Sequence, residues 1–303
     1  MTTCPPDDVV REVERALADG ASPAPRVHGA ARVSGGCISP SARLTLEGGT
    51  EVFLKWSPTA PEDMFTTEAA GLDALRGGRG LRIPEVLGLG TTQAGVSWLL
   101  LEFIPAGQPT EEFWSRLALG LVDLHRTVDD DFGWAEDNYI GSLPQANRGE
   151  TDWASFWWLR RLEPQLRMAR NKGFLLGDQE FWQILERDLP AVLDDVPDQT
   201  ASLLHGDLWS GNVYASTEGD PVVIDPAVYL GHAEVDIAMT ELFGGFAPEF
   251  HDAYNEAASV SPLYEAGRRD LYQLYPLMVH VNLFGGSYEV GVQAALGRAI
   301  RLI

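Results

Sequence analysis

With 303 residues, 45% of them hydrophobic, the chain is long enough to bury a large core as one domain or two lobes. Its formal net charge of −22, from 22 basic and 44 acidic residues, argues against nucleic acid or an anionic membrane as the main partner. No apolar run approaches the roughly 20 residues of a membrane span, and the N-terminus lacks the features of a signal peptide. Its two cysteines, Cys4 and Cys37, provide no disulfide framework, so we expect a reduced, cytoplasmic protein.

The first third of the chain predicts a small sheet with two helices. Apolar spacing predicts helices over residues 7–17 and 62–76, and alternation predicts strands over residues 26–33, 42–46, 51–56, 83–90 and 96–101. A period of two in the third strand places Phe53 and Lys55 on one face, with Val52, Leu54 and Trp56 on the other.

Lys55 stands out because the sequence contains only two lysines, Lys55 and Lys172. A lysine inside a strand requires a carboxylate partner, and Glu68, in the middle of the following helix, is the best candidate. The alternative for Glu68 is a position on a solvated helix face. Upstream, Gly35 and Gly36 lie between two predicted strands, where a glycine-containing loop covers phosphates in kinases; alone they would indicate an ordinary hairpin turn.

A Pro/Gly connector after the fifth strand marks a candidate lobe boundary. It divides the chain into an N-lobe of residues 1–103 and a C-lobe of residues 104–303. Adenine is expected to dock at this connector, on backbone groups of Glu102 and Ile104. Beyond it the pattern is mainly helical, with helices predicted over residues 110–127 (N-cap Thr110), 152–172, 179–193, 237–243, 268–284 and 288–302.

The most informative stretch is His-Gly-Asp-Leu-Trp-Ser-Gly-Asn, residues 205–212, followed by a predicted hairpin that ends at Asp225. The hairpin would bring Asp225 back beside Asn212 and so gather three side chains, Asp207, Asn212 and Asp225. The spacing matches the kinase catalytic loop H-R-D-x-x-x-x-N, with Gly206 in place of the arginine. The alternative to a catalytic site is an Asp-rich turn that caps a hairpin. The second Asp, on the returning strand, favours the catalytic site.

These residue types suit phosphoryl transfer. Mg2+ takes hard oxygen ligands, few of them from protein, so Asn212 and Asp225 are the candidate metal ligands. Asp207 would then be free to accept the proton of an attacking hydroxyl. Ten residues separate Asp225 from Asp236, which leaves no room for a phosphorylatable activation loop, so the acceptor should be a small molecule or a small group on a larger one. Asp236 would anchor the catalytic loop backbone or, alternatively, place a charge at a helix N-terminus.

The sequence also resembles the fructosamine kinase (ketosamine 3-kinase) family, within the protein-kinase-like fold, over nearly its whole length. The most specific match is the string at residues 205–212, because related aminoglycoside and choline kinases usually lack the Trp-Ser pair. The other matching residues are Gly35-Gly36-Cys37-Ile38-Ser39, Lys55, Met64-Phe65, Glu68, Pro144-Gln145, Asn147, Asp225-Pro226-Ala227, Tyr229, Gly231-His232, Glu234, Phe243-Gly244-Gly245-Phe246 and Leu271-Tyr272-Gln273-Leu274-Tyr275. The family pattern usually has a third glycine where this chain has Ser34.

The resemblance implies a bilobal α+β fold, with an antiparallel N-lobe sheet plus one long helix and a mainly helical C-lobe. It implies ATP-dependent phosphorylation of the 3-hydroxyl of ketoamines, small or protein-linked, with Mg2+; the 3-phosphate is unstable, so the sugar is shed and the amine regenerated. Asp207 would be the base, Asn212 and Asp225 the metal ligands, and Lys55, tied to Glu68, would hold the α/β-phosphates. Trp209 would form a wall for the sugar.

Two other functions remain open from the sequence. One is another small-molecule kinase of the aminoglycoside or choline type with the same catalytic set, and the other is a catalytically silent kinase-like binding module. The presence of Lys55, Asp207, Asn212 and Asp225 argues against the silent module, which would not need these residues. Cys37, in the glycine loop, is either a small space-filling side chain or a thiol redox switch.

Overall fold

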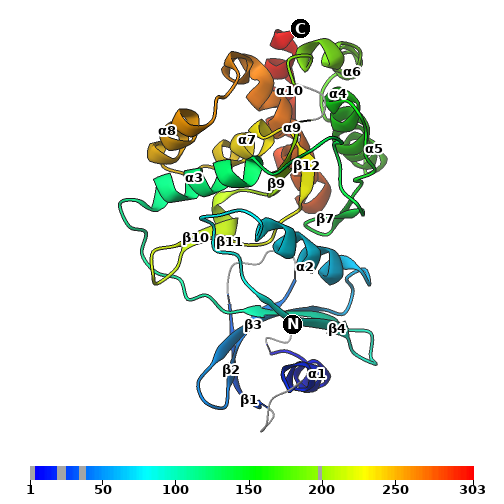
Figure 1. The fold of residues 1–303 in the computed structure, drawn as a ribbon. Coiled ribbons are helices and arrows are strands. Elements are labelled where there is room, and N and C mark those ends of the chain that lie inside the picture. The colour runs from blue at the N-terminus through cyan, green and yellow to red at the C-terminus, as the bar shows by residue number, and fades with distance from the viewer. Residues whose placement is uncertain (1–3, 19–24, 34–38, 197–199) are drawn as a thin grey trace.

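A five-stranded antiparallel sheet forms the N-terminal part of the computed structural model, which describes residues 4–18, 25–33, 39–196 and 200–303 (Figure 1). The strand order is β1-β2-β3-β5-β4. The strands are β1 (Val27–Arg32), β2 (Ser41–Leu46), β3 (Glu51–Ser57), β4 (Val86–Thr91) and β5 (Ser97–Glu102). Each predicted strand of this region is therefore confirmed to within a few residues.

Two helices cover opposite faces of this sheet (Figure 1). On the outer face, α1 (Asp7–Leu17) packs its buried Val9 and Val13 in a small core that includes Leu54 of β3 and Leu100 of β5. On the face toward the C-lobe, α2 (Met64–Leu75) joins the large core of the molecule. The alternation predicted for β3 explains this division, because successive side chains of a strand point to opposite faces.

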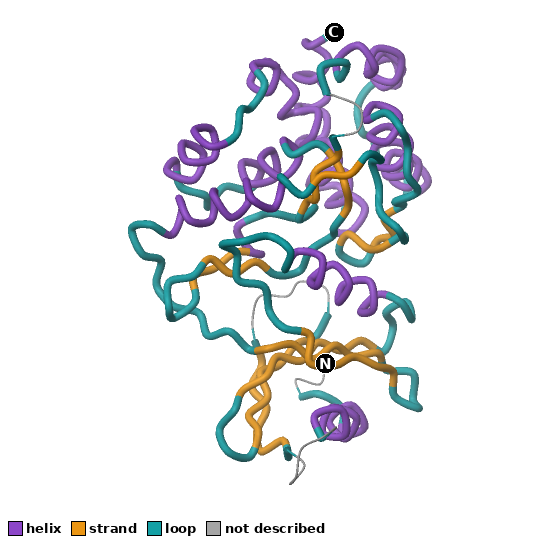
Figure 2. The backbone as a smooth tube through the Cα atoms, viewed as in Figure 1, coloured by secondary structure: helices purple, strands orange, loops and turns teal. Residues whose placement is uncertain are grey.

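The C-lobe is mainly helical, with short strands among its helices and at its junction with the N-lobe (Figure 2). Its helices are α3 (Phe113–His125), α4 (Trp153–Phe156), α5 (Glu163–Asn171), α6 (Gln179–Val192), α7 (Glu234–Leu242), α8 (Pro248–Ala257), α9 (Arg269–Phe284) and α10 (Glu289–Ala299). Its strands pair as β6 (Val128–Asp129) and β12 (Tyr229–Gly231) on either side of β9 (Ala201–Leu204), β7 (Asn138–Ile140) with β8 (Leu143–Gln145), and β10 (Val213–Ala215) with β11 (Pro221–Val223). The predicted α+β class is confirmed.

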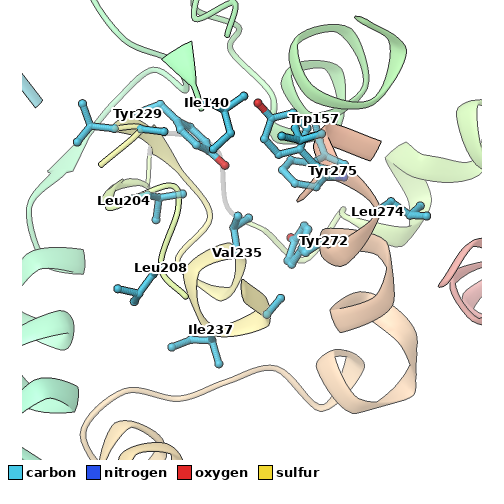
Figure 3. Close-up of a cluster of buried hydrophobic side chains, with 14 of the residues drawn as sticks. Ile140, Trp157, Leu204, Leu208, Tyr229, Val235, Ile237, Tyr272, Leu274 and Tyr275 are labelled. Atoms are coloured by element: carbon cyan, nitrogen blue, oxygen red, sulfur yellow. The ribbon is translucent and has the colours of Figure 1, made fainter. Parts of the chain in front are cut away.

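Aromatic side chains fill the centre of the C-lobe (Figure 3). Trp157 is fully buried, and its ring meets those of Tyr272 and Tyr275 from α9 edge-on, at 5.1 and 5.9 Å between centroids. Such edge-to-face pairs add to the free energy gained by burying the rings. The tryptophans between residues 153 and 182 are therefore core residues, as the sequence predicted, apart from the half-buried Trp158.

Two details of the predicted C-lobe were wrong, and two elements were not predicted. Thr110 does not cap α3: the helix begins at Phe113, and the Thr110 carbonyl accepts a hydrogen bond from the Phe113 N–H at 3.2 Å. The single helix expected over residues 152–172 is interrupted by a π-helical turn, η1 (Trp157–Leu162), which separates α4 from α5. Helix α8 and the hairpin β7–β8 were not predicted at all.

Backbone hydrogen bonds join the two lobes near the predicted boundary. Arg82, before β4, donates its N–H to the Pro221 carbonyl at 2.8 Å and accepts from the Val223 N–H at 3.1 Å. The Gly107 N–H, in the connector, donates to the Ala215 carbonyl at 2.8 Å. The hairpin β10–β11 thus lies against the connector, and the division at residue 103 stays a prediction.

Candidate active site

Lys55 of β3 and Glu68 of α2 form the ion pair predicted from the sequence. Their atoms Nζ and Oε1 are 2.6 Å apart, and Lys55 Nζ also lies 2.5 Å from Oδ1 of Asp225. Burial by itself would lower the pKa of Lys55, but the carboxylates of Asp225 and Glu68 raise it above its ordinary value. Lys55 therefore remains a cation inside the protein and joins the N-lobe to the loop after β11.

The change Lys55→Met tests this pairing. It leaves two half-buried carboxylates without their counter-charge, so we expect a loss of about 2 kcal/mol in the free energy of unfolding. Turnover should fall about a hundredfold or more, because the predicted contact with phosphate would be lost as well. Lys172→Met is the matched control, since Lys172 lies in the C-lobe and donates to the Asn282 carbonyl at 2.6 Å. Equal effects of the two variants on both measurements would contradict a special role for Lys55.

The catalytic loop runs from His205 to Asn212, between β9 and β10, and Asp236 of α7 holds its start. The Asp236 carboxylate accepts hydrogen bonds from the His205 N–H at 2.8 Å and the Gly206 N–H at 2.9 Å. His125 of α3 adds a contact to the same carboxylate at 3.2 Å. Although burial would raise the pKa of Asp236, these partners, His125 first, bring it below its ordinary value. The predicted anchoring role is confirmed, and Asp236 also lies in the first turn of its helix.

His205 is a structural residue of this loop. Its Nε2 lies 3.0 Å from the Ile224 carbonyl, which can only accept, so Nε2 carries the proton and Nδ1 accepts from the Asp207 N–H at 3.3 Å. Burial lowers the pKa of His205, in agreement with a neutral ring. The imidazole thereby fixes the backbone of Asp207 relative to the strand that leads to Asp225.

Asp207 is oriented by Asn212. The Asn212 amide donates to the Asp207 carbonyl at 2.8 Å and to its carboxylate Oδ2 at 3.1 Å. Burial, and next the negative charge of Asp225, raise the pKa of Asp207 to about 7. A carboxylate with a pKa near neutrality is suited to proton transfer at physiological pH.

Asp225 follows β11 in a left-handed backbone conformation, with φ of 56°, which is uncommon for a residue other than glycine. The Ile224 N–H donates to the Asn212 carbonyl at 3.0 Å, so the hairpin brings Asp225 beside Asn212 as the sequence predicted. The side chains of Asp225 and Asn212 offer the oxygen donors that Mg2+ prefers. The described residues contain no cluster of three or more His, Cys, Asp or Glu side chains able to hold a metal, so phosphate oxygens and water would have to complete the coordination of such an ion.

A buried polar network, which the sequence did not predict, supports the segment after Asp225. Asn138 of β7 donates to the Val228 carbonyl at 2.8 Å, and Gln145 of β8 donates to the Ala227 carbonyl at 3.1 Å and to Asn138 Oδ1 at 2.8 Å. Tyr275 donates its hydroxyl to Gln145 Oε1 at 2.7 Å. The side chains of β7 and β8 thus hold the backbone of residues 227 and 228 in place.

A buried arginine completes this network. Arg161 is fully buried and donates to the Ala146 carbonyl at 2.6 Å and to Asn147 Oδ1 at 2.8 Å. Its guanidinium carbon lies 3.9 Å from the centroid of the Tyr229 ring, a cation–π contact. Asn147 in turn donates to Asn138 Oδ1 at 2.7 Å. The only sequence signal for this network was the family match, which included Gln145, Asn147, Tyr229 and Tyr275.

Residues of the ion pair, the catalytic loop and the β7–β8 hairpin line a cleft of about 120 Å3 between α2, β7 and the catalytic loop. Six of the predicted site residues contribute to its lining: Lys55, Glu68, Asp207, Trp209, Asn212 and Asp225. Asn138, Tyr139 and Gly141 of the unpredicted hairpin also line it. Tyr139 donates its hydroxyl to Asp63 Oδ1, just before α2, at 2.6 Å and so ties the hairpin to the N-lobe.

Trp209 lies two residues after Asp207, half-buried, with its ring edge-on to that of Phe243 at 6.1 Å. It forms part of the cleft lining, so its expected place beside the base agrees with the structure, while its contact with sugar stays a prediction.

The remaining predicted nucleotide contacts lie outside this cleft or outside the described residues. At the connector, the Glu102 N–H already donates to the Glu85 carbonyl at 2.7 Å, and the Ile104 carbonyl accepts from the Tyr214 hydroxyl at 3.1 Å. Adenine would have to use the Glu102 carbonyl and the Ile104 N–H. Gly35, Gly36 and Cys37 lie outside the described residues, so the glycine loop and the redox switch stay predictions.

Comparisons with known proteins agree with this geometry. The model of the family described as fructosamine kinase matches residues 9–301. A probable ketoamine kinase of Synechocystis sp. is 38% identical over 89% of this chain and 90% of its own length. A chloroplastic protein-ribulosamine 3-kinase of Arabidopsis thaliana is 34% identical over 89% of this chain and 82% of its own.

Solved structures of related proteins are similar to this chain in three dimensions as well. The crystal structure of a putative fructosamine-3-kinase from Thermobifida fusca is 33% identical, with a TM-score of 0.84, covering 98% of this chain and all of the other. An aminoglycoside phosphotransferase in complex with AMP-PNP and hygromycin B is 16% identical, with a TM-score of 0.62 over 96% of this chain and 98% of its own, and shares the fold. The expected protein-kinase-like fold is thereby confirmed. No helix within the described residues is long and apolar enough to cross a membrane.

Proposed function

Since the chain belongs to the fructosamine kinase family, we propose that it phosphorylates the 3-hydroxyl of ketoamines with ATP and so acts in deglycation. The observation that supports this most strongly is the convergence of Lys55, Asp207, Asn212 and Asp225 on one cleft, with Trp209 in its wall. A protein that only binds a ligand has no need of a lysine–carboxylate pair, a carboxylate of raised pKa and two oxygen ligands in this arrangement. The sugar is fructose- or ribulose-derived, and its carrier is a small amine or a protein.

One group of residues would bind ATP and the metal, and another would act on the acceptor. Lys55, held by Glu68, would bind the α/β-phosphates of ATP, and Asn212 and Asp225 would hold Mg2+. When bound, the metal would supply positive charge beside the phosphates. The sequence assigns the covering of the phosphates to Gly35 and Gly36, and Glu102 and Ile104 would contact the adenine through their backbone.

Asp207 acts on the acceptor. Its carboxylate accepts a hydrogen bond from the sugar 3-hydroxyl, orients the oxygen towards the γ-phosphate and takes its proton as the new bond forms. The amide of Asn212 holds that carboxylate in place. Trp209 packs against the sugar and excludes water, which would otherwise compete for the phosphoryl group. The resulting 3-phosphate is unstable, so the sugar is lost and the amine is regenerated.

The test is ADP release with Mg-ATP across a panel of ribulose- and fructose-derived ketoamines, amino alcohols and aminoglycosides. We expect turnover on the ketoamines and a product phosphorylated at the sugar 3-position, identified by NMR before it decomposes. Turnover confined to amino alcohols or aminoglycosides would retain the catalytic residues but refute the deglycation role. ATP binding without turnover on any acceptor would indicate a binding module instead.

A further inference from the structure

A row of aromatic rings extends from Trp209 along the surface of the C-lobe. Phe243, at the end of α7, meets Trp209 at 6.1 Å and His280 of α9 at 4.7 Å. His280 in turn lies 5.5 Å from Phe284 and 5.0 Å from Tyr288. We call Phe243, His280, Phe284 and Tyr288 the aromatic ledge. Trp209 belongs both to the cleft lining and to this row, so the ledge begins where the cleft ends.

The ledge is held in a fixed position relative to the catalytic loop. Gly245, two residues after Phe243, has φ of 96°, and a Cβ at this position would lie 2.5 Å from the Cβ of Ser210. Only glycine allows the backbone that carries Phe243 to approach the residue after Trp209 so closely. On the other side, His280 and Phe284 lie on the last turns of α9, which packs against α7 and α10.

The ledge is exposed at Phe243 and Phe284 and half-buried at its other two members. Phe243 is 38% exposed and Phe284 is 50% exposed, whereas Tyr288 packs against the large core. Exposed aromatic rings beside a catalytic site are a common sign of ligand binding. A purely structural group of rings would be expected to bury them, as the rings of Trp157 and Tyr272 are buried in the centre of the same lobe.

His280 adds a hydrogen-bond acceptor to this group of rings. Its Nδ1 lies 2.8 Å from the Pro276 carbonyl, which can only accept, so Nδ1 carries the proton of the neutral ring. Burial lowers the pKa of His280, which favours this neutral form. Within the described residues no hydrogen bond to Nε2 is found, so its lone pair can accept one beside the rings of Phe243, Phe284 and Tyr288.

A ketoamine presents a matching group next to its sugar. Its nitrogen is a secondary amine that carries a positive charge and N–H donors when protonated, and methylene groups of the carrier follow in amines of the lysine type. A cation of this kind is attracted to aromatic faces, and its N–H groups need an acceptor. The methylene groups would gain free energy by covering exposed ring surface.

We propose that the aromatic ledge binds the protonated nitrogen and the first carrier methylenes of the ketoamine, with Nε2 of His280 as acceptor for its N–H. The proposal rests on the proposed function and adds to it the residues that recognise the amine. The sugar occupies the cleft beside Asp207 and Trp209, and the carrier leaves along the ledge toward Phe284 and solvent. Because the outer end of the ledge is exposed, it accepts carriers of any length beyond their first methylenes.

The test compares a ketoamine made from a short alkylamine with its ether isostere, in which oxygen replaces the nitrogen and no charge can form. We expect wild-type protein to prefer the amine over the ether by at least about tenfold in kcat/KM. The variants His280→Phe and Phe284→Leu should raise KM for the ketoamine about tenfold and reduce this preference. Their kcat and their KM for ATP should stay within about twofold of wild type, because neither residue contacts the phosphates.

Phe181→Leu is the matched control. Phe181 is 41% exposed on α6, and no ring contact joins it to the ledge in the part of the chain that the structure describes, so the amine preference should not change. A second measurement needs no variant: a secondary alkylamine without sugar should inhibit competitively against ketoamine and not against ATP. Its ether counterpart should not inhibit.

The outcomes separate the two proposals. An unchanged amine preference in folded His280→Phe and Phe284→Leu proteins, together with no inhibition by the alkylamine, would overturn the role of the ledge and leave the kinase function intact. Failure of the wild-type protein to phosphorylate any ketoamine would overturn the proposed function, and the ledge's role with it.

Discussion

Replacing Asp207 with asparagine is expected to reduce kcat for ketoamine phosphorylation by about a thousandfold, since an amide cannot accept the proton of the 3-hydroxyl. The substitution keeps the shape of the side chain beside Asn212, so ATP should bind with an affinity close to that of wild type. Turnover is measured by ADP release and ATP affinity by calorimetry. Asp220→Asn, a change in the hairpin β10–β11 whose carboxylate pairs with Arg116, is the control and should retain activity.

The same variant should be at least as stable as wild type. The folded-state pKa of Asp207 is raised to about 7, first by burial and then by Asp225, so the folded protein disfavours the ionised carboxylate. A group of raised pKa leaves stability unaffected below its unfolded pKa and lowers it progressively as the pH rises toward the folded pKa. Asparagine removes this cost at neutral pH, so the melting temperature should be unchanged or higher. A clear decrease would mean that the ionised carboxylate stabilises the fold.

The change Gly206→Ala should have a large effect on stability. Gly206 has φ of 79°, and a Cβ there would lie 2.1 Å from the Ala227 carbonyl oxygen, a backbone atom that cannot move aside as a side chain can. We expect the free energy of unfolding to fall by about 2–4 kcal/mol and turnover to fall with it, because the His205 carbonyl accepts from the Ala227 N–H in this contact.

The change Gly95→Ala measures the cost of backbone strain alone, without the steric clash expected at position 206. Gly95 has φ of 80°, but a Cβ there would have no atom within 4 Å beyond its chain neighbours, so alanine should cost only about 1 kcal/mol. Urea unfolding of both variants gives the comparison. If the two variants lose the same stability, the loop after β11 can move away from Gly206, and its contact with the catalytic loop is weaker than we infer.

The sequence predicted those parts of the site that depend on local pattern. Alternation in β3 placed Lys55 on the face toward α2, and the turn between β10 and β11 predicted that Asp225 would return beside Asn212. Both follow from short-range rules, the period of a strand and the composition of a turn. Glu68 could be proposed because its helix follows Lys55 directly along the chain.

The parts that were missed depend on contacts distant in sequence. Nothing local shows that Asn138 and Gln145 bond to carbonyls 90 and 82 residues later. The hairpin β7–β8 has strands of three residues, too short for a reliable alternation signal. The π-helical turn within residues 152–172 is invisible to a helical period, which predicts one continuous helix. Thr110 has a favourable N-cap side chain, but the chain makes another turn before α3 begins.

The buried side chains of β7 and β8 that hold residues 227 and 228 have a consequence for regulation. In protein kinases, the segment after the metal-binding Asp is ordered by phosphorylation, and that ordering turns the enzyme on. Here internal amide and tyrosine side chains hold the corresponding segment from the moment the chain folds. We therefore expect an enzyme that needs no phosphorylation of this segment to become active, so that its output is not limited by a kinase acting on it.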